Sequence, residues 1–165
     1  MYSLIFSVTV EAQALLYKEP YCPQVHFSPP LYWINDRNGL VYHNGVYHMF
    51  YQHSPMGIQW GYMSWGHAIS KDLVHWQNLP LAIEEGKETM IFSGTCVVDN
   101  NNTNGFRKQG KAAMVAIYTG HIERESQSQH IAYSIDEGLT WTKYQNNPVL
   151  DLGSKGKAIA TQINF

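Results

Sequence analysis

The dipeptide Asn44-Gly45 separates two β-rich runs, at 40–43 and 46–51. Asn-Gly readily adopts the positive φ angles of a two-residue hairpin turn, so these residues predict an antiparallel hairpin. Further strands are expected at 65–70, 91–98, 112–118, 130–134 and 140–144, with turn-forming stretches between them. No stretch has a convincing 3.6-residue period. The pattern therefore predicts an all-β fold, as a sandwich, a barrel or a propeller.

An internal repeat favours the propeller. The pattern Ala-x-Ser-x-Asp at 68–72, followed by Trp76, returns at 132–136, followed by Trp141. Both copies are predicted to form a strand, a turn and a strand, and four short strands per unit fit a propeller blade. Two blades fit in this chain. A propeller closes only with about four or more blades, so two blades alone would leave edges and faces exposed, and an unstable isolated chain is one alternative.

Composition excludes several classes of protein. Hydrophobic residues make up 44% of the 165 residues and charged residues 15%, which excludes a disordered chain and suits one domain. A net charge of -2 without a basic cluster argues against a nucleic-acid partner. Cys22 and Cys96 are too few for a disulfide framework, and neither they nor the eight His, including His43 and His48, have metal-ligand spacing. We expect no metal and no cofactor.

The N-terminus bears on localisation. Residues 1–14 contain an apolar run with an A-x-A-like end, which indicates a secretory signal peptide or else an ordinary N-terminal strand. Asn101-Asn102-Thr103 is a glycosylation acceptor sequence, which suits a secreted protein. No apolar stretch approaches the ~20 residues of a membrane-spanning helix, so no membrane partner is expected. We expect a secreted or extracellular protein.

Asp36 is the candidate catalytic group. It lies in the segment WINDRNG at 33–39, among short polar residues and before Gly39, which suits a tight turn. Such a setting holds a carboxylate at a strand end with Asn side chains as partners, although an Asp in this context also serves simply to form a turn.

Eight segments in this order resemble glycoside hydrolase family 32: HFSPP (26–30), WIND (33–36), FYQ (50–52), WG (60–61), WGHAIS (65–70), DLVHW (72–76), FSG (92–94) and NPVLD (147–151). The resemblance covers about residues 24–154. It implies a five-bladed β-propeller, of which about two blades lie in this chain, and cleavage of fructosides such as sucrose, inulin or levan. The sequence leaves open which fructoside is used, and whether the reaction is hydrolysis or fructosyl transfer.

The resemblance assigns roles to six positions. Asp36 would be the nucleophile of a retaining glycosidase, whose second carboxylic acid stands ~5–5.5 Å away. The family supplies that acid as a Glu beyond this chain. The positions expected to contact sugar are Asn35, Gln52, Trp60, Phe92 and Ser93. From the residues alone, Trp60 and Phe92 could equally be core aromatics, Gln52 a polar group at a strand end, and Ser93-Gly94 a β-bulge. Trp33, Trp65, Trp76 and Trp141 are expected to be mostly structural.

Some positions depart from the family pattern. Arg37 follows Asp36 where the family has Pro, which brings a cation next to the carboxylate. His53 stands where Tyr is usual, and Thr95-Cys96 replaces a smaller pair. Residues 155–165 lack resemblance and contain no Arg-Asp-Pro, the family's transition-state stabilising motif. We therefore expect a truncated chain with negligible hydrolysis. The alternative is a non-catalytic carbohydrate-binding or inert propeller fragment.

Overall fold

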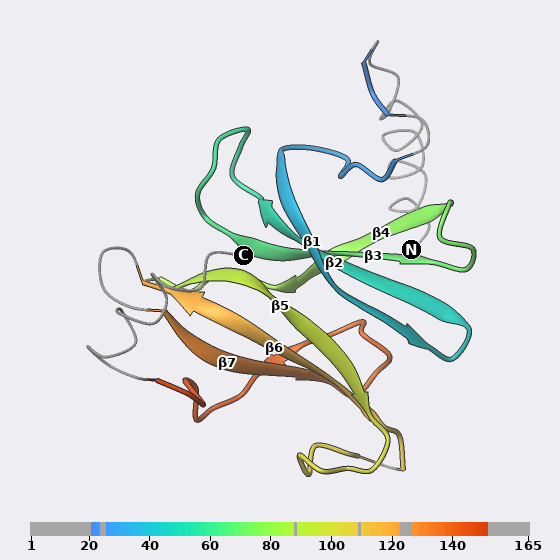
Figure 1. Ribbon diagram of the computed structural model, residues 1–165, viewed down its shortest axis with the longest axis vertical. Coiled ribbons are helices and arrows are strands. Elements are labelled where there is room, and N and C mark those ends of the chain that lie inside the picture. The colour runs from blue at the N-terminus through green and yellow to red at the C-terminus, as the bar shows by residue number, and fades with distance from the viewer. Residues whose placement is uncertain (1–20, 24–25, 88, 109, 123–126, 152–165) are drawn as a thin grey trace, which may run out of the picture.

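The computed structural model describes residues 21–23, 26–87, 89–108, 110–122 and 127–151. The predictions for 1–14 and 155–165 lie outside these residues. The described part forms two four-stranded antiparallel sheets, each a meander in chain order (Figure 1). The first contains β1 (Trp33–His43), β2 (Val46–Ser54), β3 (Ser64–Ser70) and β4 (Trp76–Ile83); the second contains β5 (Met90–Asp99), β6 (Ala113–His121), β7 (Gln127–Ser134) and β8 (Thr142–Lys143). Over the same ranges, no helix is long and apolar enough to cross a bilayer.

The predicted hairpin is confirmed. His43 pairs with Val46, and Asn44 and Gly45 have φ angles of 48° and 83°. These are the positive values that favour Asn-Gly in a two-residue turn. The predicted strands are present with shifted ends, but no strand was predicted where β4 lies. It contains Pro80, which cannot donate to a ladder, and it lies at the edge of its sheet, where proline is tolerated.

The internal repeat forms the turn between the third and fourth strands of each sheet. The Ser70 hydroxyl donates to Asp72 Oδ1 (3.1 Å), and the Ser134 hydroxyl donates to Asp136 Oδ1 (2.7 Å). In both copies, the tryptophan that follows donates its indole N–H to a carbonyl within the turn, at 3.1 and 3.0 Å. The repeated residues therefore build the same hydrogen-bonded blade turn, and these two tryptophans have the structural role expected of them.

The main core lies between the two sheets. Side chains alternate across a strand, so every second residue of each sheet faces the other sheet. Phe50 of the first sheet contacts Trp141 with ring centroids 5.3 Å apart, and Trp65 contacts Tyr118 at 6.1 Å. The opposite face of the second sheet leaves Ile117 38% exposed, as expected for a blade face without a neighbour.

The first strands of the two sheets, β1 and β5, lie side by side where the sheets meet (Figure 1). Gly39 lies at this junction. Its φ is +60°, and a Cβ there would stand 2.8 Å from Phe50 Cδ2 of the same sheet and 3.5 Å from Cys96 Cβ of β5. Gly39 thus lies inside a strand, where a side chain would collide with the Phe50 ring, and not in the tight turn predicted for it.

A histidine pair, His48 and His67, is buried on the face of the first sheet that packs against the second sheet. His48 Nδ1 and His67 Nε2 share a hydrogen bond of 3.1 Å, and the two rings stack. One nitrogen donates and the other accepts, which requires an unprotonated ring. Burial, with a smaller contribution from the neighbouring His48, lowers the pKa of His67 to about 3. Burial and the nearby His43 also lower the pKa of His48, while Glu137 acts in the opposite direction.

Because of this histidine pair, we expect the folded chain to lose stability in acid. Unfolded histidine binds a proton below about pH 6.5, whereas folded His67 does not until about pH 3. Because of His67 alone, the free energy of unfolding should therefore fall by about 1.4 kcal/mol for each pH unit between these two values. Urea denaturation at pH 7, 6 and 5 measures this slope where most carboxylates are still ionised.

The control is His67→Phe, which keeps a ring against Phe50 but cannot titrate, and which should reduce the slope. Burial also lowers the pKa of His53 and of His130, so part of the slope should persist. An equal slope in wild type and variant would show that His67 does not cause the acid sensitivity.

Candidate active site

Two β-bulges place the site residues. On β1, Ile34 pairs with His53 and Arg37 pairs with Tyr51, so Asn35 and Asp36 together oppose a single residue. On β5, the register shifts in the same way between Ile91 and Gly94, at Phe92 and Ser93. A bulge re-aims the side chains of its strand. Asp36 therefore lies within a strand, and not in the turn expected from its neighbours.

A hydrogen-bond network joins four of the predicted residues. The Ser93 hydroxyl donates to Asp36 Oδ2 at 2.9 Å, and Gln52 Nε2 reaches the same oxygen at 3.5 Å. Gln52 Nε2 also donates to Ser93 Oγ at 2.6 Å, and Asn35 Nδ2 donates to Gln52 Oε1 at 3.3 Å. Gln52 is 4% exposed, whereas Asp36 is exposed. The network thus anchors the solvent-facing Asp36 carboxylate to the buried Gln52 amide.

Trp33 extends the network, a role that the sequence analysis did not assign to it. Its indole N–H donates to Asn35 Oδ1 at 2.8 Å. Because Asn35 Oδ1 accepts this bond, its amide nitrogen faces Gln52. The donors then follow one direction from the indole to the Asp36 carboxylate, which accepts the last bond. Trp33 and Asn35 are two residues apart, a spacing that places two side chains on one face of a strand. This spacing was the available signal for their contact in the sequence.

An aromatic wall lies next to the network. Trp60, in the connection between β2 and β3, is 54% exposed and meets Phe92 edge-on, with centroids 6.2 Å apart. The His121 ring stacks on Phe92 at 4.5 Å and 18°. The Trp65 indole N–H donates to Phe92 O at 3.0 Å and so secures the bulge. The position of His121 at the end of β6 carried no signal in the sequence.

The positions that depart from the family pattern have structural roles. Arg37 Nη2 donates to Phe27 O at 2.7 Å, so this guanidinium contacts the backbone that precedes β1. His53 Nδ1 forms a hydrogen bond of 2.8 Å with Trp33 O, and burial lowers the pKa of His53. Cys96 is buried between the sheets, and burial raises the pKa of its thiol to about 12. Cys96 is therefore a packing group and not a reactive thiolate.

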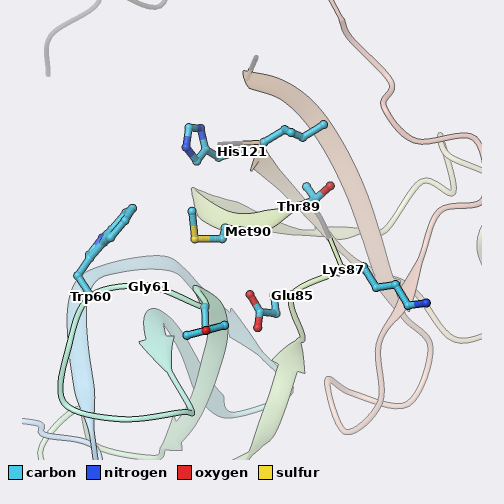
Figure 2. Close-up of a pocket in the computed structure, with 10 residues that line it drawn as sticks. Trp60, Gly61, Glu85, Lys87, Thr89, Met90 and His121 are labelled. Carbon is cyan, nitrogen blue, oxygen red and sulfur yellow. The ribbon is translucent and has the colours of Figure 1, made fainter. Parts of the chain in front are cut away.

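A cleft of about 640 Å³ opens beside the aromatic wall (Figure 2). The β2–β3 connection, the β4–β5 connection and the end of β6 line it. Trp60 and His121 belong to both the wall and the cleft, whereas Asp36 lies outside the cleft lining. In the described ranges, no group of three or more His, Cys, Asp or Glu is placed to hold a metal ion.

Comparison with known proteins finds one matching family model and several relatives of that family. The family model "Glycosyl hydrolases family 32 N-terminal domain" matches residues 26–161. This match extends past residue 154, where the resemblance based on sequence motifs ends. A levanase of Bacillus subtilis is 51% identical over 153 residues, which cover 91% of this chain and 22% of the levanase. An extracellular exo-inulinase of Aspergillus awamori is 48% identical, with 88% and 30% covered. An invertase of Schizosaccharomyces pombe is 46% identical, with 80% and 24% covered.

Solved structures share the arrangement of strands. The crystal structure of the Aspergillus awamori exo-inulinase matches with a TM-score of 0.78 and 49% identity, over 81% of this chain and 29% of that one. A beta-fructofuranosidase of Schwanniomyces occidentalis, complexed with fructosyl-erythritol, matches with a TM-score of 0.75 and 44% identity, over 79% and 27%. The chain thus spans less than a third of the length of these relatives.

Proposed function

The chain belongs to glycosyl hydrolase family 32. Its two sheets are two blades of a five-bladed propeller. We propose that its site cleaves fructosides, with Asp36 as the nucleophile. The observation that carries the proposal is the hydrogen bond of 2.9 Å from Ser93 to an exposed carboxylate. This donor comes from a different sheet, so the contact forms only when the two blades pack together. A turn-forming Asp would not need such a partner.

The geometry suits attack by one carboxylate oxygen. Within the described residues, hydrogen bonds to the Asp36 side chain reach Oδ2 only. These donors hold the carboxylate in place. Oδ1 would attack the anomeric carbon of a fructosyl unit, and the bond from that carbon to the leaving oxygen would break. A paired carboxylic acid ~5–5.5 Å away would protonate the leaving oxygen and then activate water, which releases the fructose with retention.

The remaining predicted residues would recognise the fructosyl unit. The Asn35 amide would meet sugar hydroxyls, with the buried Gln52 amide holding it in place, and Trp60 and Phe92 offer apolar faces to the ring. The names of the relatives, a levanase, exo-inulinases and invertases, support levan, inulin or sucrose as the substrate. The description of the Aspergillus enzymes as extracellular supports an extracellular site of action.

Fructose binding by the chain tests the proposal. Gln52→Ala should weaken binding by about tenfold, because it removes the buried amide that holds both Asn35 and Ser93 in place. Isothermal titration calorimetry with fructose measures this. The matched control is Gln77→Ala, an exposed glutamine of β4, which should leave affinity unchanged.

Two results would contradict the proposal: no fructose binding by the folded wild-type chain, or equal binding by the wild type and Gln52→Ala. By the family resemblance, the paired acid belongs to a part of the propeller other than the two blades formed here. We therefore expect fructose to bind without measurable hydrolysis of sucrose, inulin or levan by this chain, because general acid–base catalysis contributes ~10²–10⁴-fold to the rate.

A further inference from the structure

We propose that Arg37 and His53 are positioning residues, which hold the bulge of β1 that carries Asp36. Both positions depart from the family pattern, in which Pro and Tyr are usual. The inference rests on the proposed function, because it takes the bulge as the part of the site that meets the fructosyl unit. It concerns two side chains that act on the backbone of the site and do not themselves contact the sugar.

The bulge needs support from outside the strand ladder. Asn35 and Asp36 together oppose a single residue of β2, so the regular pairing of the ladder is interrupted here. A proline after Asp36 would restrict this stretch, because its ring fixes φ. Arg37 leaves φ free, so side-chain contacts must supply the restraint instead.

His53 holds the start of the bulge. It pairs with Ile34, the last regular pair before the shift in register. Its Nδ1 donates to Trp33 O at 2.8 Å, and since a carbonyl oxygen only accepts, Nδ1 carries the proton. The Trp33 N–H in turn donates to Gly57 O at 3.1 Å. Both backbone groups of Trp33 are therefore held, and the bulge begins from a fixed point.

Arg37 holds the end of the bulge. It pairs with Tyr51 across the ladder, and its Nη2 donates to Phe27 O at 2.7 Å. The Phe27 ring packs on Tyr51, with centroids 5.1 Å apart, and on Trp76 at 6.1 Å. The carbonyl that Arg37 binds thus belongs to a segment anchored on the same sheet. Within the described ranges, no ion pair joins Arg37 to Asp36, so the guanidinium contacts the backbone and not the carboxylate.

Fructose binding by the full chain, measured by isothermal titration calorimetry, tests both residues. Arg37→Ala removes the bond to Phe27 O, and His53→Phe keeps a ring but removes the donor to Trp33 O. Each variant should weaken fructose binding by about fivefold, the factor of one ordinary hydrogen bond, because the bulge loses its fixed position. Urea denaturation shows whether each variant is folded.

Two further variants separate positioning from a direct role. Arg37→Pro has neither charge nor donor but fixes φ, and β1 is an edge strand, where proline is tolerated. His53→Asn keeps an N–H donor for Trp33 O. Both should bind fructose within about twofold of the wild type, because each restores the restraint by other means. If they bind as weakly as Arg37→Ala and His53→Phe, the positioning role is overturned.

The two weakening variants have matched controls. Arg107 is also exposed, and its guanidinium also donates to a backbone carbonyl, that of Asn100, in the connection between β5 and β6. His130 is likewise partly buried on a strand, and its ring shares a hydrogen bond with Ser128. Arg107→Ala and His130→Phe should leave fructose affinity unchanged.

The outcomes separate the two proposals. If the wild type binds fructose and both Arg37→Ala and His53→Phe bind it equally well, the positioning role is overturned and the fructosyl site stands. If the folded wild-type chain binds no fructose, the fructosyl site is overturned, and the positioning role with it.

Discussion

Replacing Asp36 by asparagine is expected to lower kcat for levan hydrolysis by roughly 10⁴-fold or more, in an enzyme where residues 26–151 of this chain replace the matching segment of the Bacillus subtilis levanase. The two proteins are 51% identical over 153 aligned residues, so the graft should fold like the segment it replaces. Asparagine has the shape of aspartate and an oxygen that can accept the bond from Ser93. It has no carboxylate to form the covalent intermediate, so the loss should appear in kcat with little change in folding.

The matched control is Asp72→Asn, in the turn between β3 and β4. This side chain accepts hydrogen bonds from the backbone of its own turn, so the variant should alter stability but not kcat. If Asp36→Asn keeps more than about a hundredth of the activity, Asp36 is not the nucleophile. A folded but inactive wild-type graft would count against the proposed function itself.

The second large effect is on stability. Trp65→Ala is expected to lower the free energy of unfolding by about 3–5 kcal/mol, the usual cost of deleting a buried aromatic side chain. Trp65 is fully buried, between Phe50 at 5.5 Å and Tyr118 at 6.1 Å. It joins the two blades and donates a hydrogen bond to Phe92 O. Its removal should therefore also loosen the bulge that carries Ser93, and weaken fructose binding.

Urea denaturation followed by circular dichroism measures this loss. Trp60→Ala provides the control, because its side chain is 54% exposed and its removal should cost less than about 1 kcal/mol. Equal costs for Trp60 and Trp65 would contradict the packing described here. A broad, non-cooperative transition of the wild type would instead support the alternative that two blades alone do not form a stable unit.

Local chemistry made much of the fold predictable. The Asn44-Gly45 turn depends on two residues with positive φ, and the repeated Ser-x-Asp turns depend on hydrogen bonds between residues two apart. The strand β4 was missed because Pro80 suggests a break, and only its place at a sheet edge makes proline acceptable.

The site was predictable only in part. Its residues were named from the order of family motifs, but nothing local shows that Asp36 sits on a bulge or that Gln52 reaches Ser93, 41 residues away. His121, which stacks on Phe92, escaped prediction because it lies at the end of β6, outside the motifs that carry the family resemblance.

The sequence by itself determined the all-β class, the hairpin, the repeated blade turns and the family, because each of these depends on neighbouring residues or on motif order. Only the tertiary structure decided how the two blades pack, which residue donates to Asp36, and where the cleft opens. The physical reason is that these features depend on contacts between the two sheets, above all between β1 and β5. Such contacts form only after the two sheets pack together around their shared core.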